Sequence, residues 1–132
     1  MPVRPDGSEA SLDAALAAAR AAAGKQARDL VILDVHELIV ITDYFVICSG
    51  GSERQVRTIV EEVERSLRDL DRKPLRREGE TEGRWVLLDY VDVVVHVFAP
   101  QEREYYDLER LWRDAPRVPF EDEGRAVAGS VD

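Results

Sequence analysis

The clearest pattern in the chain is an apolar stripe that follows the glycine pair Gly50-Gly51. Ser52 and Gln55 have the spacing of a capping box, in which the serine side chain accepts the Gln55 N–H and the glutamine reaches back. Apolar residues then recur at intervals of three and four, at Val56, Ile59, Val60, Val63, Leu67 and Leu70. This spacing predicts an amphipathic helix from Glu53 to about Leu70.

Short runs of apolar residues elsewhere predict four β-strands. They cover residues 30–33, 44–49, 85–88 and 93–98. Continuous apolar runs are typical of strands that are buried on both faces, so we expect a sheet covered by helices. The last two runs are joined only by residues 89–92, and so short a link predicts an antiparallel hairpin.

Two further helices complete the predicted domain. An alanine-rich segment from Ser8 or Ser11 to about Ala23 has apolar residues at helical spacing, and residues 103–112 form the second helix. We expect a disordered lead-in over residues 1–7, one domain over residues 8–113 and a flexible acidic tail over residues 114–132. Residues 72–77 are basic and precede three glutamates, which indicates a solvated loop. The order α-β-β-α-β-β-α predicts an α/β/α-layered α/β domain with a mixed or antiparallel sheet of about four to five strands.

Composition limits the class of partner. The chain has 132 residues and a formal net charge of −9, and nearly all of that charge falls within residues 29–112. Nucleic-acid binding depends on Lys and Arg that neutralise phosphates, so little or no direct nucleic-acid binding is expected. A basic protein is the expected partner, because opposite surface potentials steer association. Cys48 is the only cysteine. Without a disulfide, a signal peptide or a long apolar run, we expect a cytoplasmic protein with no membrane contact.

An enzymatic reading rests on two groups of residues. Gly51-Ser52 at a helix N-terminus could hold a phosphate, and Asp89 with Asp92 could bind magnesium, as in a nucleotidyltransferase. However, nucleotidyl transfer needs two carboxylates on one strand face, and residues three apart on a strand point to opposite faces. His96 lies within an apolar run and is expected to be a hydrogen-bonded core residue. We therefore expect no catalytic residue, no cofactor and no metal site.

Aromatic residues are concentrated toward the C-terminal part of the predicted domain. They are Trp85, Tyr90, Phe98, Tyr105, Tyr106 and Trp112. Trp and Tyr dominate the residues that contribute most to protein interfaces. We expect Phe98 and Trp112 in the core, and at least one residue of the Tyr105-Tyr106 pair at the surface. Residues 85–112 are therefore the candidate docking region.

Several stretches, in order along the chain, resemble the ribosomal silencing factors, also called the Iojap-like family. They are Thr42–Gly50, Ser52 with Gln55, Glu78-Gly79, Trp85-x-Leu87-x-Asp89, Asp92–Phe98 and Arg103–Trp112. Single pieces are weak signals, but the ordered set is specific and extends over about residues 9 to 113. The resemblance implies a nucleotidyltransferase-like fold that lacks the enzymes' active site.

The resemblance also implies a function. Members of this family bind the large ribosomal subunit through its universal ribosomal protein fourteen, which is the basic partner that the charge indicates. They block joining of the small subunit sterically and repress translation when nutrients are scarce, as part of a stress response. The partner-binding residues that the resemblance implies are Trp85, Asp89 and Tyr90, followed by Arg103, Tyr105 and Tyr106. It also implies self-association, so a homodimer is expected.

One departure from the family pattern lies inside this region. Family members usually have glycine where this chain has Val91. A β-branched residue adopts a positive φ only with strain. The turn over residues 89–92 is therefore expected to differ in type, with Tyr90 redirected.

Overall fold

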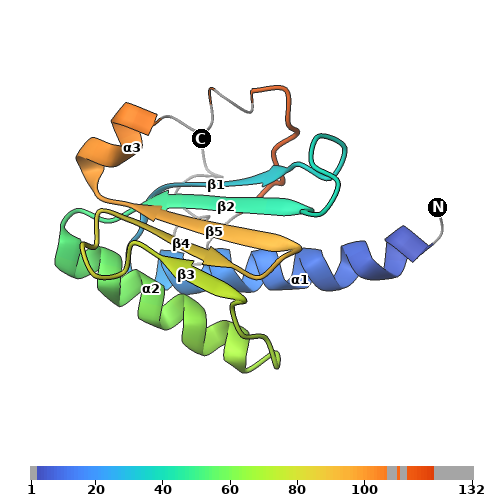
Figure 1. Cartoon of the computed structure of the whole chain (residues 1–132), viewed down its shortest axis with the longest axis horizontal. Coiled ribbons are helices and arrows are strands. Elements are labelled where there is room, and N and C mark those ends of the chain that lie inside the picture. Colours follow the sequence, from blue (N-terminus) through green and yellow to red (C-terminus); the bar gives the residue numbers. More distant parts are fainter. Residues whose placement is uncertain (1–2, 107–109, 111–112, 121–132) are drawn as a thin grey trace, which may run out of the picture.

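The computed structural model describes residues 3–106, 110 and 113–120 (Figure 1). Its elements in chain order are α1 (Val3–Gly24), β1 (Arg28–Asp34), β2 (Tyr44–Ser49), α2 (Glu53–Arg68), β3 (Arg76–Glu78), β4 (Trp85–Asp89), β5 (Val93–Phe98) and α3 (Pro100–Tyr106). The strands form a single five-stranded sheet in the order β1-β2-β5-β4-β3. The predicted α/β class and mixed sheet are confirmed.

The neighbouring strands β2 and β5 are parallel, and the other neighbouring pairs are antiparallel. Tyr44 pairs with Val93 at one end of the parallel pair, and Ser49 pairs with Phe98 at the other. All residues of both strands are buried, including Cys48. Burial raises the pKa of the Cys48 thiol to about 12, so this cysteine is an unreactive core residue.

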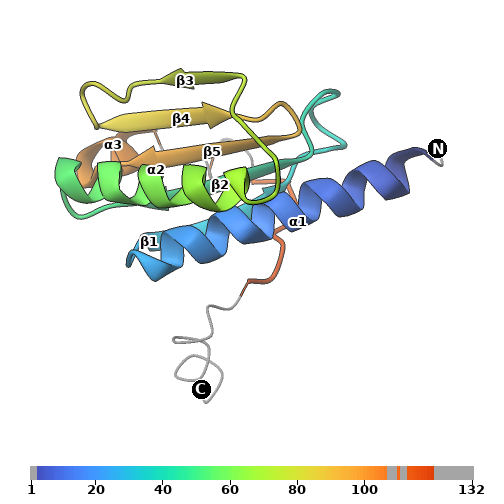
Figure 2. The same ribbon diagram turned by 90° about the horizontal axis from the view of Figure 1, so that it is seen from below.

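Helices α1 and α2 lie side by side across one face of the sheet (Figure 2). The predicted stripe of α2 is the buried one, with Val56, Ile59, Val63 and Leu67 fully enclosed. Fully burying each such side chain stabilises the fold by roughly 1.5–3 kcal/mol. On α1 the buried residues are mainly alanines, whose small size lets the helix approach the sheet closely.

The start of α2 forms as the capping box predicts. Ser52 Oγ accepts a hydrogen bond from Gln55 N at 3.1 Å, and Gln55 Oε1 accepts one from Gly51 N at 2.6 Å. Gln55 Nε2 also donates to the carbonyl oxygens of Lys25 and Gln26, at 3.1 and 3.2 Å. One glutamine therefore caps α2 and joins it to the end of α1.

The opposite face of the sheet is covered less completely. Helix α3 lies on this side (Figure 1), and residues 113–120 run along the edge of β1, with Val118 and Phe120 packed against the core on the α1 side. Asp34 N donates to the carbonyl oxygen of Pro116, and Val118 N donates to that of Ile32, both at 2.8 Å. Ala115 is buried against the same side of β1 and β2. The layering is thus asymmetric, with two long helices on one face and a short helix with a chain segment on the other.

The structure corrects the predicted element order at several points. The basic segment is not a free loop, because Arg76–Glu78 forms the edge strand β3. Residues 116–118 lie along β1, although the sequence indicated a flexible tail there. Helix α1 begins at Val3, within the expected lead-in. The last helix, α3, spans Pro100–Tyr106. Trp112, which was expected in the core, lies outside the described residues.

Within the described ranges, no helix combines the length and the apolar character needed to cross a membrane.

Candidate functional site

Alternate residues of β4 point to the two different faces of the sheet. Val86, Leu88 and Tyr90 belong to the core beneath α1 and α2. Trp85 and Leu87 pack on the opposite side, with the second core cluster. We call this second side the open face. Because side chains alternate along a strand, Asp89 falls on the open face with Trp85, and Tyr90 does not.

The open face contains a groove of about 340 Å³ at the end of the sheet where β4 turns into β5. It is lined by Ile39, Ile41, Thr42, Phe45, Leu75, Arg76, Leu87, Asp89, Val91, Val94 and His96. The lining comes from the β1–β2 connection, the segment before β3, the β4–β5 turn and the four strands β2, β3, β4 and β5. It is mostly apolar, with one arginine and one aspartate at its edge.

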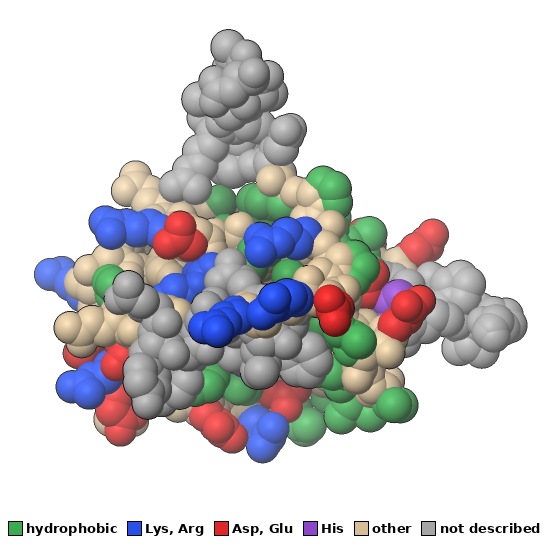
Figure 3. Space-filling model, turned by 90° about the horizontal axis from the view of Figure 1, so that it is seen from above, with side chains coloured by type: hydrophobic (Ala, Val, Ile, Leu, Met, Phe, Trp, Pro, Cys, Tyr) green, Lys and Arg blue, Asp and Glu red, His purple; other side chains and the backbone are tan. Residues whose placement is uncertain are grey.

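Exposed hydrophobic side chains surround this groove. Ile41 is 71% exposed, Leu75 70% and Val91 46%, and the neighbouring Val40 is 92% exposed. Figure 3 views the molecule from the side opposite α1 and α2, and hydrophobic side chains gather at its right-hand end, near the β1–β2 connection and the β4–β5 turn. Contiguous apolar surface of this kind marks an interaction site on a soluble protein.

Trp85 is fixed against the open face by two aromatic neighbours. Its ring stacks on Phe98 with centroids 5.0 Å apart, and its indole Nε1–H donates to His96 Nδ1 at 3.2 Å. Because the indole can only donate, Nδ1 must be unprotonated and the neutral ring carries its proton on Nε2. Nε2 has no hydrogen-bond partner. Burial lowers the pKa of His96 to about 4, so the predicted core role of His96 is confirmed.

Gly79 lets the β3–β4 connection pass close to Trp85. Its φ is +82°, and a Cβ at this position would lie 1.9 Å from the Trp85 carbonyl oxygen. No residue other than glycine fits so close an approach without movement of the backbone. The Glu78-Gly79 pair of the family pattern therefore has a structural role at the start of β4.

Asp89 and Asp92 are each bound to an arginine of the segment that was expected to be a solvated loop. Arg72 makes two hydrogen bonds of 2.7 Å to the carboxylate of Asp92, and Arg76 donates to Asp89 Oδ2 at 3.0 Å. Burial alone would raise the pKa of Asp92, but hydrogen bonds from Arg72 and Ser11 hold it below its ordinary value. Both aspartates are therefore parts of ion pairs rather than freely solvated carboxylates.

The Ser11 hydroxyl joins this ion pair to α1. It lies 2.6 Å from Asp92 Oδ2 and 2.7 Å from Asp43 Oδ2. Helix α1, the β1–β2 connection and the β4–β5 turn thus meet at one buried polar cluster. The cluster lies between the covered face and the groove and holds the turn in place.

Val91 occupies a strained turn at the rim of the groove. Its φ is +79°, and Asp92 N donates to the Tyr90 carbonyl oxygen at 3.0 Å, which closes a three-residue turn of the rare, strained kind. Val91 N donates to Asp89 Oδ1 at 2.8 Å, and Thr42 Oγ1 donates to Val91 O at 3.1 Å. The valine therefore adopts the positive φ that sequence reasoning considered unfavourable.

Two other predicted partner-binding residues, Tyr90 and Arg103, do not line the groove on the open face. Tyr90 is buried on the covered face, and its hydroxyl has no hydrogen-bond partner. Arg103 is buried and donates to Ser49 Oγ at 2.9 Å and to the Asp29 carbonyl oxygen at 2.6 Å. The backbone of Tyr105 and Tyr106 belongs to α3, but their side chains lie outside the described part of the structure.

The residues of the enzymatic alternative lie at opposite ends of the sheet. Gly51-Ser52 follows the end of β2 at Ser49, whereas Asp92 precedes the start of β5 at Val93. In the parallel register these ends are separated by the length of a six-residue strand, which is roughly 17 Å. The glycine turn and the aspartates therefore do not converge on one bound nucleotide.

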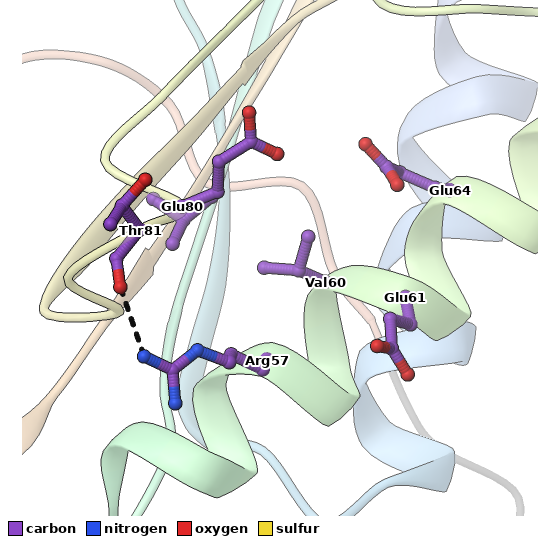
Figure 4. Close-up of a pocket in the computed structure, with 7 residues that line it drawn as sticks. Arg57, Val60, Glu61, Glu64, Glu80 and Thr81 are labelled. Atoms are coloured by element: carbon purple, nitrogen blue, oxygen red, sulfur yellow. Dashed lines mark hydrogen bonds between the residues drawn. The ribbon is translucent and has the colours of Figure 1, made fainter.

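A second hollow, of about 420 Å³, lies between α2 and the β3–β4 connection. Arg57, Glu61 and Glu64 extend from α2, and Glu80 with Thr81 faces them from the connection (Figure 4). Arg57 donates to the Thr81 carbonyl oxygen at 3.0 Å, and Glu64 accepts a hydrogen bond from Arg77. Most of this lining is charged or polar, so the apolar groove is the stronger candidate for docking.

Sequence reasoning missed the residues that form the walls of the groove, including Ile41, Leu75 and Leu87. Two signals could have found them. The alternation along β4 places Leu87 with Trp85 and Asp89. The apolar run Leu38–Ile41 lies in a connection between strands, where polar residues are usual, and so indicates exposed apolar surface.

Comparison with known proteins agrees with the pattern in the sequence. Residues 8–130 match the model of a family described as "Ribosomal silencing factor during starvation". The Bacillus subtilis protein named ribosomal silencing factor RsfS is 46% identical over 99 residues, covering 75% of this chain and 84% of its own length.

A more distant relative and a solved structure extend the comparison. A mouse protein named mitochondrial assembly of ribosomal large subunit protein 1 is 33% identical over 91 residues, covering 67% of this chain and 40% of its own length. A crystal structure of a Chromobacterium violaceum protein matches with a TM-score of 0.75 and 32% identity, covering 83% of this chain and 90% of its own.

Proposed function

The chain belongs to the ribosomal silencing factor family, and from this premise we propose that it represses translation by binding the large ribosomal subunit. In this proposal the bound protein occupies space that the small subunit needs and so prevents subunit joining. The family's description refers to starvation, which supports action under nutrient limitation. The mouse relative is named for the ribosomal large subunit, which supports that subunit as the target.

The observation that carries this proposal is the apolar groove on the open face, bordered by exposed Ile41 and Leu75. Side chains of this size lose contact with water only when another surface covers them, and a fully buried leucine gains roughly 1.5–3 kcal/mol. Rigid strands form the floor of the groove, so the surface is organised before the partner arrives.

The proposed partner on the subunit is its basic protein fourteen. A chain with a net charge of −9 is attracted to a basic surface, which increases the association rate. We assign direct contact to Trp85, Leu87 and Asp89. Tyr90 and Arg103 are buried, and we assign them the role of holding the face in shape. Contact by Tyr105 and Tyr106 stays a prediction.

A homodimer is the competing use of the same face. Two copies carry like charge, which opposes their association, whereas a basic subunit surface does not. We place the protein in the cytoplasm, where ribosomal subunits are found. An enzymatic role has no support from the geometry, because its proposed residues lie at opposite ends of the sheet.

The test is co-sedimentation of the purified protein with isolated large and small subunits. The wild type should sediment with large subunits and not with small ones. Leu75→Glu should weaken this association by about tenfold or more, because it places a charge in an apolar contact. Leu70→Glu is the matched control, since Leu70 is 48% exposed but does not line the groove. Wild-type protein that stays at the top of the gradient would refute the proposal.

A further inference from the structure

Val91 combines backbone strain with an exposed side chain. Its φ of +79° lies in a region that L side chains enter only at a cost, greatest for β-branched residues. Such a cost is often offset by burial of the side chain, but Val91 is 46% exposed. The isolated protein therefore gains little from the valine at this position.

The surroundings hold Val91 in this conformation from both sides of the residue. Asp89 Oδ1 accepts a hydrogen bond from its N–H, and the buried Thr42 donates one to its carbonyl oxygen. The neighbouring Asp92 is fixed by Arg72. These neighbouring residues therefore hold the turn in one conformation. The isopropyl group of Val91 is held at a fixed position on the rim of the groove.

We infer that Val91 is a contact residue for the partner, and that the groove beside it receives an apolar side chain from a basic protein surface. This inference rests on the proposed function and adds the chemistry of the docked group. The two charged groups at the groove edge, Arg76 and Asp89, are already paired with each other at 3.0 Å. The groove therefore offers no unpaired charge to a ligand, and its walls favour an uncharged, apolar group.

Two proteins could supply that apolar side chain, a second copy of this chain or a basic ribosomal protein, and net charge favours the second. A second copy of this chain also has a formal net charge of −9, and repulsion between two molecules of like net charge opposes their association. A ribosomal protein with a basic surface brings the opposite charge, which favours association. The occupant is therefore an apolar residue of the ribosomal partner, surrounded by lysines and arginines.

The test compares Val91→Gly and Val91→Ala in thermal unfolding and in large-subunit binding. Val91→Gly should raise Tm by about 4 °C, because glycine adopts a positive φ without strain. It should also weaken binding by about fourfold, the effect expected for losing half of a buried valine. Val91→Ala should lose nearly as much affinity with a smaller rise in Tm, because alanine keeps a Cβ but lacks the isopropyl group.

Four results would overturn the inference. Val91→Gly that binds as tightly as the wild type would show that the side chain makes no contact. Weak binding by Val91→Gly together with normal binding by Val91→Ala would show that the rigidity of the turn matters instead. An unchanged Tm for Val91→Gly would show that the turn is not strained. Light scattering that shows a loss of dimer with unchanged subunit binding would assign the contact to a second copy.

The proposed function and this inference can be refuted separately. If folded wild-type protein does not sediment with large subunits at all, the proposed function is wrong. If the wild type binds and Val91→Gly binds equally well, only the inference fails. Leu70→Ala serves as the control, because it removes an exposed apolar group away from the groove and should change neither Tm nor binding appreciably.

Discussion

The two faces of the sheet use the same strands in different ways. Val86 and Leu88 of β4 are buried beneath two helices, as is Tyr90 directly after the strand. Trp85, Leu87 and Asp89 lie on a face that a short helix and a chain segment cover only in part. The larger of the two clusters of buried apolar residues lies on the covered face, so that face should contribute more to stability. The open face retains exposed apolar groups, which contribute little to folding and remain available to a partner.

Truncating one leucine on each face gives the largest expected difference. Leu88→Ala removes a fully buried side chain and should destabilise the fold by about 3 kcal/mol. Leu75→Ala removes a side chain that is 70% exposed and should cost less than about 0.5 kcal/mol. Urea denaturation followed by circular dichroism measures both. Equal losses of stability would mean that the open face is part of the folding core.

Lowering the pH should destabilise the fold through His96 on the open face. Burial lowers its pKa from 6.5 to about 4, so the unfolded chain takes up this proton at a higher pH than the folded one. Stability should therefore fall as pH falls from 6.5 toward 4, with about 2 kcal/mol lost between pH 7.5 and pH 5. His96→Phe should lack this share of the pH dependence. Parallel stability curves for the two proteins would contradict a buried neutral histidine.

The polar cluster that joins the two faces should have a smaller effect. Asp92→Asn removes the charge that binds Arg72 and should destabilise the fold by about 1.5 kcal/mol at neutral pH. The pKa of Asp92 is lowered in the folded state, so its contribution is present above the ordinary aspartate pKa and is lost as pH falls through the folded value. Equal stability of the two proteins at pH 7 would show that this cluster does not hold the turn.

Much of the covered face could be predicted from the sequence because its signals are local. The spacing of Val56, Ile59, Val63 and Leu67 determines which side of α2 is buried, and Ser52 with Gln55 marks its start. The apolar runs of β2 and β5 likewise indicated strands buried on both sides. Periodicity and capping both act within a few residues, so one chain is enough to recognise them.

The open face was harder to predict because it depends on residues far apart in the chain. Strand β3 is short and fully exposed, and it exists because Arg76–Glu78 pairs with β4 rather than because of its own apolar pattern. The resemblance grouped Tyr90 with Asp89 as partner-binding residues, although alternation places their side chains on opposite faces. Arg103 was expected to bind the partner, and its contacts with Ser49 and Asp29 could be seen only in three dimensions.

The claim that the open face acts on the ribosome, while the covered face stabilises the fold, is tested most directly by measuring the joining of ribosomal subunits. Large subunits are incubated with the protein, small subunits are added, and joined ribosomes are measured by sedimentation. Wild type and Leu70→Glu should reduce joining to the same extent, and Leu75→Glu should have lost most of this effect while remaining folded. If Leu75→Glu blocks joining as well as the wild type does, the open face is not the surface that acts on the ribosome.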